Sequence, residues 1–183
     1  MLDIDIQNPK PDKILSISPS RKAIGVALVD GVGVQKTWLF RAGQVKEAES
    51  LVLKAREWLT AIFGDESPTI VAIEDLKPKQ ATALNLALIG VIEALAGTTG
   101  CHRIVRVDTG AALKHVGEYL AGADRHRRRP TLRLIAAHLE DQCPEFEIHR
   151  PRLLAVISRD WERTWGLVAK AAAIGLHARD QCR

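Results

Sequence analysis

The sequence predicts an α/β domain with a mixed sheet, in which three antiparallel strands come first and two parallel strands follow. Residues 14–41 hold three apolar, β-branched runs of strand length separated only by short turns, which is typical of an antiparallel meander. After residue 41, strand-length runs alternate with helical patterns, which is typical of parallel strands joined by helices. With 183 residues, 46% of them hydrophobic, the chain can form the core of one domain without disulfides or metals.

The first half of the chain contains the predicted meander. The first strand is followed by a polar break, Ser18-Pro19-Ser20-Arg21-Lys22, where Pro19 has no N–H to donate to a strand ladder and the serines favour a turn. We therefore expect this strand to be central in the sheet and Ser18 to lie at its exit. Strands are expected over residues 14–17, 24–29 and 34–41, and a helix over 44–63 that Gly64 ends.

The second half alternates strands and helices. Residues 69–74, TIVAIE, are apolar until they end in a carboxylate, which is typical of a parallel strand buried on both faces. Further on, the last helix carries small residues that would let it lie close against the sheet: Gly166, Ala169, Ala172 and Ala173. The remaining expected elements are a buried helix over 80–98, a strand over 101–107, a helix capped by Asp108 or Thr109 that runs to 119, a basic loop over 122–129, helices over 130–141 and 160–178, and irregular structure over 143–158. Residues 1–12 are expected to form an N-terminal arm and residues 13–183 a single domain.

Composition limits the class of protein. The formal net charge of +4 and a pI near 9.1 are compatible with a polyanionic partner. Three widely spaced cysteines without a CxxC pair indicate neither a disulfide framework nor a zinc site. Polar residues and a glycine interrupt the most apolar stretch, 81–96, so it indicates a core helix and not a membrane span. Because no signal peptide is visible, we expect a cytoplasmic location.

Several motifs in order resemble the RuvC-type Holliday junction resolvases of the ribonuclease H-like superfamily. The first strand leads into Ser18-Pro19-Ser20 and then Gly25, and the fourth strand ends in Glu74. The other matching segments are 77–96, 106–117, 125–139 and the pair Glu162 and Trp165 ahead of the last helix. The resemblance covers residues 12–178 and implies a five-stranded mixed sheet in the order 3-2-1-4-5, flanked by helices.

The resemblance also implies a metal site that this chain holds only in part. In such a site two Mg²⁺ about 4 Å apart activate a water and stabilise the leaving oxygen of a phosphodiester. Four carboxylate positions of the family correspond here to Ser18, Glu74, Glu162 and Trp165, of which only Glu74 and Glu162 can act as anionic metal ligands. The site would hold a charge of about −2 instead of about −4, so we expect metal-dependent cleavage to be lost or impaired. Mg²⁺ is the expected cofactor if the protein is active.

Basic residues predict a nucleic-acid surface. The segment after residue 124 is rich in arginine and falls where the family meets DNA, and two lysines follow the fourth strand. The candidate DNA-binding residues are Lys77, Lys79, Arg125, Arg127, Arg128, Arg129 and Arg133. The expected partner is branched or duplex DNA, with no membrane partner, and the resemblance implies a homodimer.

Other interpretations of these residues remain open. An active junction nuclease would recruit Asp75, Asp108 or Asp160 beside Glu74 and Glu162, whereas a protein–protein module would keep the fold for assembly alone. The arginine run fits a solvated charged face as well. Glu74 could be a solvated carboxylate at a strand end. Glu162 could be an acidic residue in the first turn of a helix, where its charge interacts favourably with the helix dipole. Two serines near the first turn suggest a nucleophile, but turn chemistry explains them better. A phosphotransferase of this superfamily is disfavoured, because the first hairpin lacks a glycine-rich turn.

Overall fold

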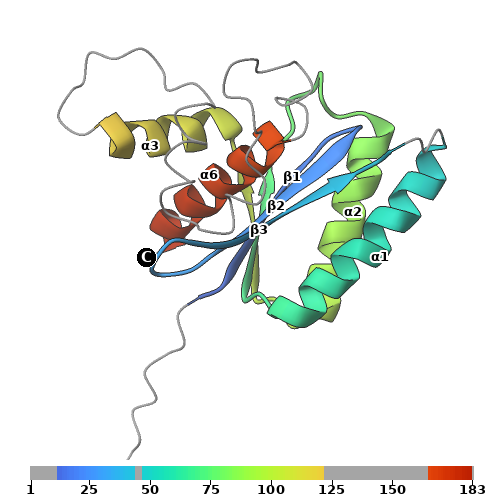
Figure 1. Ribbon diagram of the computed structural model, residues 1–183, viewed down its shortest axis with the longest axis horizontal. Coiled ribbons are helices and arrows are strands. Elements are labelled where there is room, and N and C mark those ends of the chain that lie inside the picture. The colour runs from blue at the N-terminus through green and yellow to red at the C-terminus, as the bar shows by residue number, and fades with distance from the viewer. Residues whose placement is uncertain (1–11, 44–46, 122–164, 183) are drawn as a thin grey trace, which may run out of the picture.

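The chain forms a five-stranded sheet covered by helices on both faces (Figure 1). The computed structural model describes residues 12–43, 47–121 and 165–182. The elements are β1 (Ile14–Pro19), β2 (Ala23–Val29), β3 (Val34–Arg41), α1 (Ala48–Glu66), β4 (Ile70–Glu74), α2 (Ala83–Thr98), β5 (Arg103–Val107), α3 (Thr109–Ala121) and α6 (Trp165–Cys182). The sheet order is β3-β2-β1-β4-β5, which confirms the predicted order.

The directions of the strands are also as predicted. β1 pairs with β2 and β2 with β3 in antiparallel ladders, whereas β4 is parallel to both β1 and β5. As a result, the carboxyl ends of β1, β4 and β5 meet at one edge of the sheet. The turn between β1 and β2 and the end of β3 lie at the same edge, because Pro19 pairs with Ile24 and Ala23 with Arg41.

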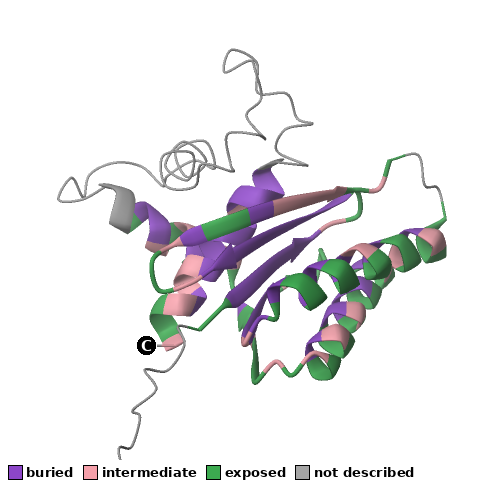
Figure 2. Ribbon diagram, turned by 60° about the horizontal axis from the view of Figure 1, so that its bottom comes forward, coloured by how far each residue is buried: buried purple, intermediate pink, exposed green. Residues whose placement is uncertain are grey.

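Two hydrophobic cores lie on the two faces of the sheet. Figure 1 shows α1 and α2 on one face and α6 with α3 on the other. Along β1 the side chains alternate, so that Leu15 and Ile17 join the core under α1 and α2 while Ile14 joins the core under α6. β1 and β2 are buried along their whole length (Figure 2). In the part of the chain that is described, no helix is both long and apolar enough to span a membrane.

Helix α6 lies in direct backbone contact with the sheet. A Cβ atom on Gly25 of β2 would lie 2.3 Å from the carbonyl carbon and oxygen of Leu167, and one on Gly175 would lie 2.6 Å from Val29 and 2.7 Å from Ser16. Neither position therefore accommodates a larger residue without moving α6. The predicted row of small residues is confirmed as buried on this helix, with Ala169, Ala172 and Ala173 at most 1% exposed.

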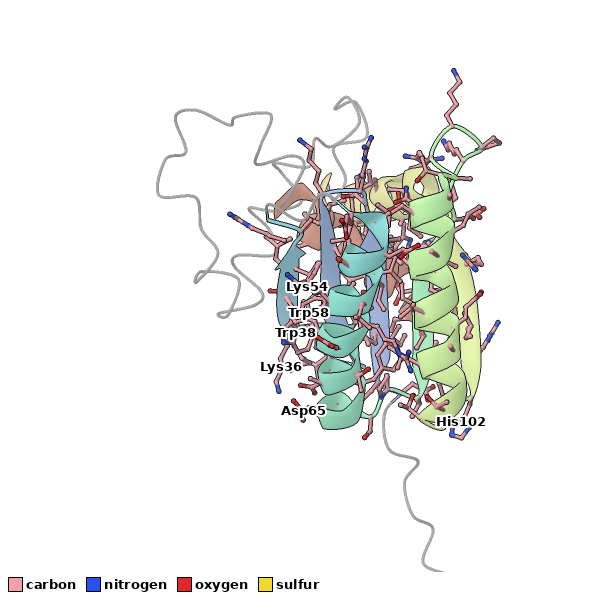
Figure 3. The ribbon with its side chains drawn as sticks, turned by 90° about the vertical axis from the view of Figure 1, so that its right-hand side faces the viewer. Lys36, Trp38, Lys54, Trp58, Asp65 and His102 are labelled. Carbon is pink, nitrogen blue, oxygen red and sulfur yellow. The ribbon has the colours of Figure 1, made fainter. Side chains whose placement is uncertain are left out.

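Aromatic side chains of the edge strand β3 pack against α1. Trp38 and Trp58 lie on neighbouring elements, β3 and α1 (Figure 3), and the rings of Phe40 and Trp58 are 5.4 Å apart. Below them, Lys36 Nζ lies 2.8 Å from Glu66 Oε1 and joins β3 to the end of α1. These contacts hold α1 over the antiparallel half of the sheet.

Some predicted boundaries are wrong. β1 was expected to end before Ser18, but it continues to Pro19. The ladder of β1 with β4 stops at Ile17, and Pro19 pairs only with β2. A missing N–H is therefore tolerated there. The first helix continues through Gly64 to Glu66, where Ser67 adopts a left-handed conformation with φ 46°. Its N–H donates to the carbonyl of Phe63 at 3.0 Å.

The described helices after β4, which are α2, α3 and α6, lie where helices were predicted but differ at their ends. α2 begins at Ala83, because the Thr82 hydroxyl accepts a hydrogen bond from the N–H of Asn85 at 3.3 Å and caps the helix. α6 continues to Cys182, four residues beyond its predicted end at residue 178. The arm, the basic loop, the helix over 130–141 and residues 160–164 lie outside the described residues.

Two histidines lie between α3 and α6. His115 Nε2 is 2.9 Å from Asp180 Oδ2, and the rings of His115 and His177 are in edge-to-face contact at 5.0 Å. Burial lowers the pKa of His177, and the neighbouring His115 lowers it further, against the opposing effects of Asp180 and Asp108. Burial raises the pKa of Asp180, but hydrogen bonds from Arg179 and His115 outweigh this and lower it overall.

We expect the free energy of unfolding to fall as the pH drops below about 6.5, the unfolded pKa of histidine. Because the folded pKa of His177 is lower, the unfolded chain binds more protons in this range, and stability is lost as the pH falls towards the folded pKa. Urea unfolding of His177→Gln between pH 5 and 8 should show a flatter dependence than the wild type. His102→Gln, at an exposed site before β5, is the control and should keep the wild-type slope. Equal slopes in all three proteins would contradict this assignment.

Candidate functional site

Two side chains meet where β1 and β4 end. β1 and β4 are parallel neighbours, and Ser18 and Glu74 both point to the face covered by α6 and α3, because they alternate with Ile17 and Ile73 of the opposite core. The Ser18 hydroxyl donates a hydrogen bond to Glu74 Oε2 at 2.5 Å. Ser18 is fully buried and Glu74 is 3% exposed. The interpretation of Glu74 as a solvated carboxylate is therefore wrong.

A third residue, Thr109, completes this group. Its hydroxyl donates to Glu74 Oε1 at 2.7 Å, so both carboxylate oxygens accept a hydrogen bond from a hydroxyl. Thr109 is the first residue of α3 and follows β5, the parallel neighbour of β4. Thr109 was predicted from the sequence only as a possible helix cap. The signal that could have found it is its place directly after a strand that ends beside Glu74.

The aspartates proposed as substitute ligands have other surroundings. Asp108 Oδ1 accepts the N–H of Ala111 at 2.8 Å and caps α3, and its Oδ2 lies 4.0 Å from Lys77 Nζ. Asp75 is exposed. Asp160 lies outside the described residues.

The described side chains do not make a two-metal centre. Hard divalent cations need several anionic oxygen ligands, and Ser18 offers only a neutral hydroxyl beside Glu74. Nowhere in residues 12–43, 47–121 and 165–182 do three acidic, histidine or cysteine side chains gather to hold a metal. Glu162 lies outside these ranges, and its assignment as a ligand stays a prediction.

The start of α6 lies close to this site. Trp165 is the first residue of α6, and the backbone of Leu167 two residues later lies against Gly25, the pairing partner of Ser18 on β2. The backbone of α6 therefore begins beside the group formed by Ser18 and Glu74.

Exposed basic residues surround the same edge of the sheet. They come from the turn between β1 and β2, the end of β3 and the loop after β4, and the amide of Ala42 donates to the carbonyl of Lys22 at 2.9 Å, which holds the end of β3 against that turn. This basic rim consists of Arg21, Lys22, Arg41, Lys77 and Lys79, all exposed. The two lysines were predicted from the sequence, and the other three were missed although Arg21 and Lys22 directly follow the site strand. The predicted candidates Arg125, Arg127, Arg128, Arg129 and Arg133 lie outside the described residues.

Solved structures share this architecture over nearly the whole chain. Thermus thermophilus RuvC aligns with a TM-score of 0.60 at 15% identity, over 93% of this chain and 95% of that one. The chain has the fold of the RuvC-type resolvases. The yeast mitochondrial Holliday junction resolvase aligns with a TM-score of 0.59 at 11% identity, over 93% of this chain and 83% of that one. A fowlpox virus resolvase aligns with a TM-score of 0.51 at 10% identity, over 92% and 99% of the two chains.

The RuvC-type fold is visible in the structure but not in sequence comparison. No protein-family model matches the chain, and no curated protein matches it. The predicted resemblance is thus confirmed as a likeness of fold at 10–15% identity. Roles of individual residues must be argued from this chain's own geometry.

We expect Ser18→Asp together with Trp165→Asp to bind Mn²⁺ more tightly than Ser18→Asp alone, because each change adds an anionic oxygen ligand at a position that the family resemblance assigns to the metal site. Isothermal titration calorimetry of both variants and the wild type measures this directly. Ser18→Asn with Trp165→Asn changes the same positions without adding charge and is the control. If the double aspartate variant binds Mn²⁺ no better than the asparagine control, position 165 does not face the metal site.

Proposed function

We propose that this protein binds branched DNA through the phosphate groups of its arms, and that its metal-dependent cleavage is lost or impaired. The observation that carries the proposal is the edge of the sheet where β1 and β4 end. There Glu74 is engaged by two hydroxyls and the exposed basic rim surrounds it. Such an edge offers cations for a polyanion but few ligands for Mg²⁺.

The DNA partner is supported by the fold and by charge. The Thermus thermophilus RuvC was solved in complex with a Holliday junction substrate, and the fowlpox virus resolvase with substrate Holliday junction DNA. This chain shares their fold over more than nine tenths of its length. Exposed guanidinium and ammonium groups on one edge can pair with the phosphates of a DNA backbone. In our proposal, the five arginines between residues 125 and 133 add to these cations.

Impaired cleavage is supported by the chemistry at Ser18. Two-metal hydrolysis needs carboxylates that bridge and neutralise the cations, and a serine hydroxyl at the end of the central strand supplies no charge. The active-nuclease alternative would be established by cleavage of a four-way junction in Mg²⁺ or Mn²⁺ at rates typical of enzymes. The assembly-module alternative would be favoured if binding to DNA showed no dependence on salt.

We expect the logarithm of the binding constant for a four-way junction to fall against the logarithm of salt concentration with a slope near −3 to −4. About four phosphates neutralised at roughly −0.9 per contact give this slope. Replacing Arg127, Arg128 and Arg129 by alanine should flatten the slope by roughly two to three units and leave the melting temperature nearly unchanged. Fluorescence anisotropy with a junction and a plain duplex measures both affinity and shape preference, and the preference for base sequence should be slight.

The matched control is Lys54→Ala with Arg56→Ala. Both residues are exposed on α1, which covers the face of the sheet opposite α6 (Figures 1 and 3). This pair should leave the slope unchanged. An unchanged slope in the triple arginine variant would mean that residues 127–129 form a solvated charged face and do not contact the DNA.

We also propose that the protein is a homodimer, which suits the two-fold arrangement of a four-armed junction. The exposed side of α2 supports this, because it carries Leu86 (53%), Ala87, Gly90 and Ala94, and Ile104 of β5 is also exposed (41%). Leu86→Glu should shift the protein towards monomer in sedimentation equilibrium. Leu53→Glu, at a comparably exposed site on α1 (55%), should not. A wild type that remains monomeric at tens of micromolar would contradict the proposal.

A further inference from the structure

We propose that Ser18, Glu74 and Thr109 form a hydroxyl clasp, a metal-independent group that joins the start of α3 to the ends of β1 and β4. In this proposal Glu74 is the acceptor at the centre of the clasp and not a vacant metal ligand, and Thr109 is the positioning residue that holds α3. The proposal rests on the geometry of these three side chains and stands independently of DNA binding.

The carboxylate of Glu74 is buried. A carboxylate that is 3% exposed has lost nearly all its water and must be compensated by donors within the protein. Ser18 and Thr109 supply one donor to each oxygen, at 2.5 and 2.7 Å, which is the range of charge-assisted O–H···O⁻ bonds. The amino end of α3 lies at Thr109, and its dipole favours a negative charge there.

The three residues stand far apart in the chain. Ser18 lies 56 residues before Glu74, and Thr109 lies 35 residues after it, so the two bonds connect distant segments. Further along α3, His115 pairs with Asp180 of α6. The clasp and this pair therefore attach α3 at two points, to the sheet and to α6.

A clasp and an unfilled metal site respond oppositely to mutation. Carboxylates gathered for a metal repel one another without it, so changing one to an amide stabilises the metal-free protein. In the clasp, the same change replaces charge-assisted bonds by weaker neutral ones and destabilises the protein. A divalent cation should stabilise a protein with an unfilled metal site, because it binds only the folded state, and should leave the stability of the clasp unchanged.

The experiment is thermal unfolding of the full chain in EDTA and in millimolar Mn²⁺. Thr109→Val and Glu74→Gln should each lower the melting temperature by roughly 4–10 °C in EDTA, whereas Thr109→Ser, which keeps the hydroxyl, should change it by about 1 °C. In the variant that combines Thr109→Val with Glu74→Gln, the melting temperature should fall by less than the sum of the two single decreases, because both changes break the same hydrogen bond. Mn²⁺ should not raise the melting temperature of the wild type.

Other results would overturn the clasp. These are a higher melting temperature for Glu74→Gln, a rise of several degrees for the wild type in Mn²⁺, or strictly additive losses in the double variant. If Thr109→Val fails to fold, Ser18→Ala with Glu74→Gln tests the same coupling from the other oxygen. Loss of junction binding alone, with these melting temperatures as expected, would reject the proposed function and leave the clasp in place.

Discussion

The contact between α6 and the sheet is the constraint on which the rest of this structure depends. α6 crosses β2 and β1 at backbone distance, which requires glycine at positions 25 and 175 and alanines between the two ends of the contact. On the sheet, the facing side chains are short, as at Ser16, whose hydroxyl turns back to the carbonyl of Ala27 at 3.0 Å. The start of α6 lies against Gly25, the pairing partner of Ser18, and Ser18 and Glu74 are buried at this end of the sheet.

The chemistry of the site follows from this burial. An ionised carboxylate sealed beneath helices needs a cation or hydrogen-bond donors, and the two choices lead to different proteins. A cation brings Lewis acidity and is exchangeable, whereas donors from Ser18 and Thr109 are fixed in place and satisfy both oxygens of Glu74. In the clasp that we propose, the hydroxyl of Ser18 at the end of the central strand engages Glu74 as a hydrogen-bond acceptor and not as a metal ligand.

The strands could be predicted because their signals are local: strand-length apolar runs, the short turns between them and the carboxylate that ends β4. The sheet order that places Ser18 next to Glu74 was predicted from the order of strands and helices together with the family resemblance, and Asp108 or Thr109 was recognised as a possible cap. The third partner of Glu74, Thr109, was predicted only as a possible cap, because its contact with Glu74 depends on where α3 begins relative to β5. The end of α1 was predicted wrongly at Gly64. The helix continues to Glu66 and is capped by Ser67 in a left-handed conformation. Arg41 was missed because only the pairing register brings it to the site edge.

The electrostatics of the edge connect the loss of carboxylates with the binding of DNA. A site of four carboxylates without cations would repel phosphate, so DNA affinity and metal occupancy are coupled where such a site is complete. In the proposed function, serine at position 18 and tryptophan at position 165 stand in place of two of those charges, and Glu74 is buried. The potential outside the site is then set mainly by the basic rim, of which Lys77 is partly offset by Asp108 at 4.0 Å. In the function that we propose, a phosphate backbone approaches this edge without a metal, and the protein binds a junction through its basic rim.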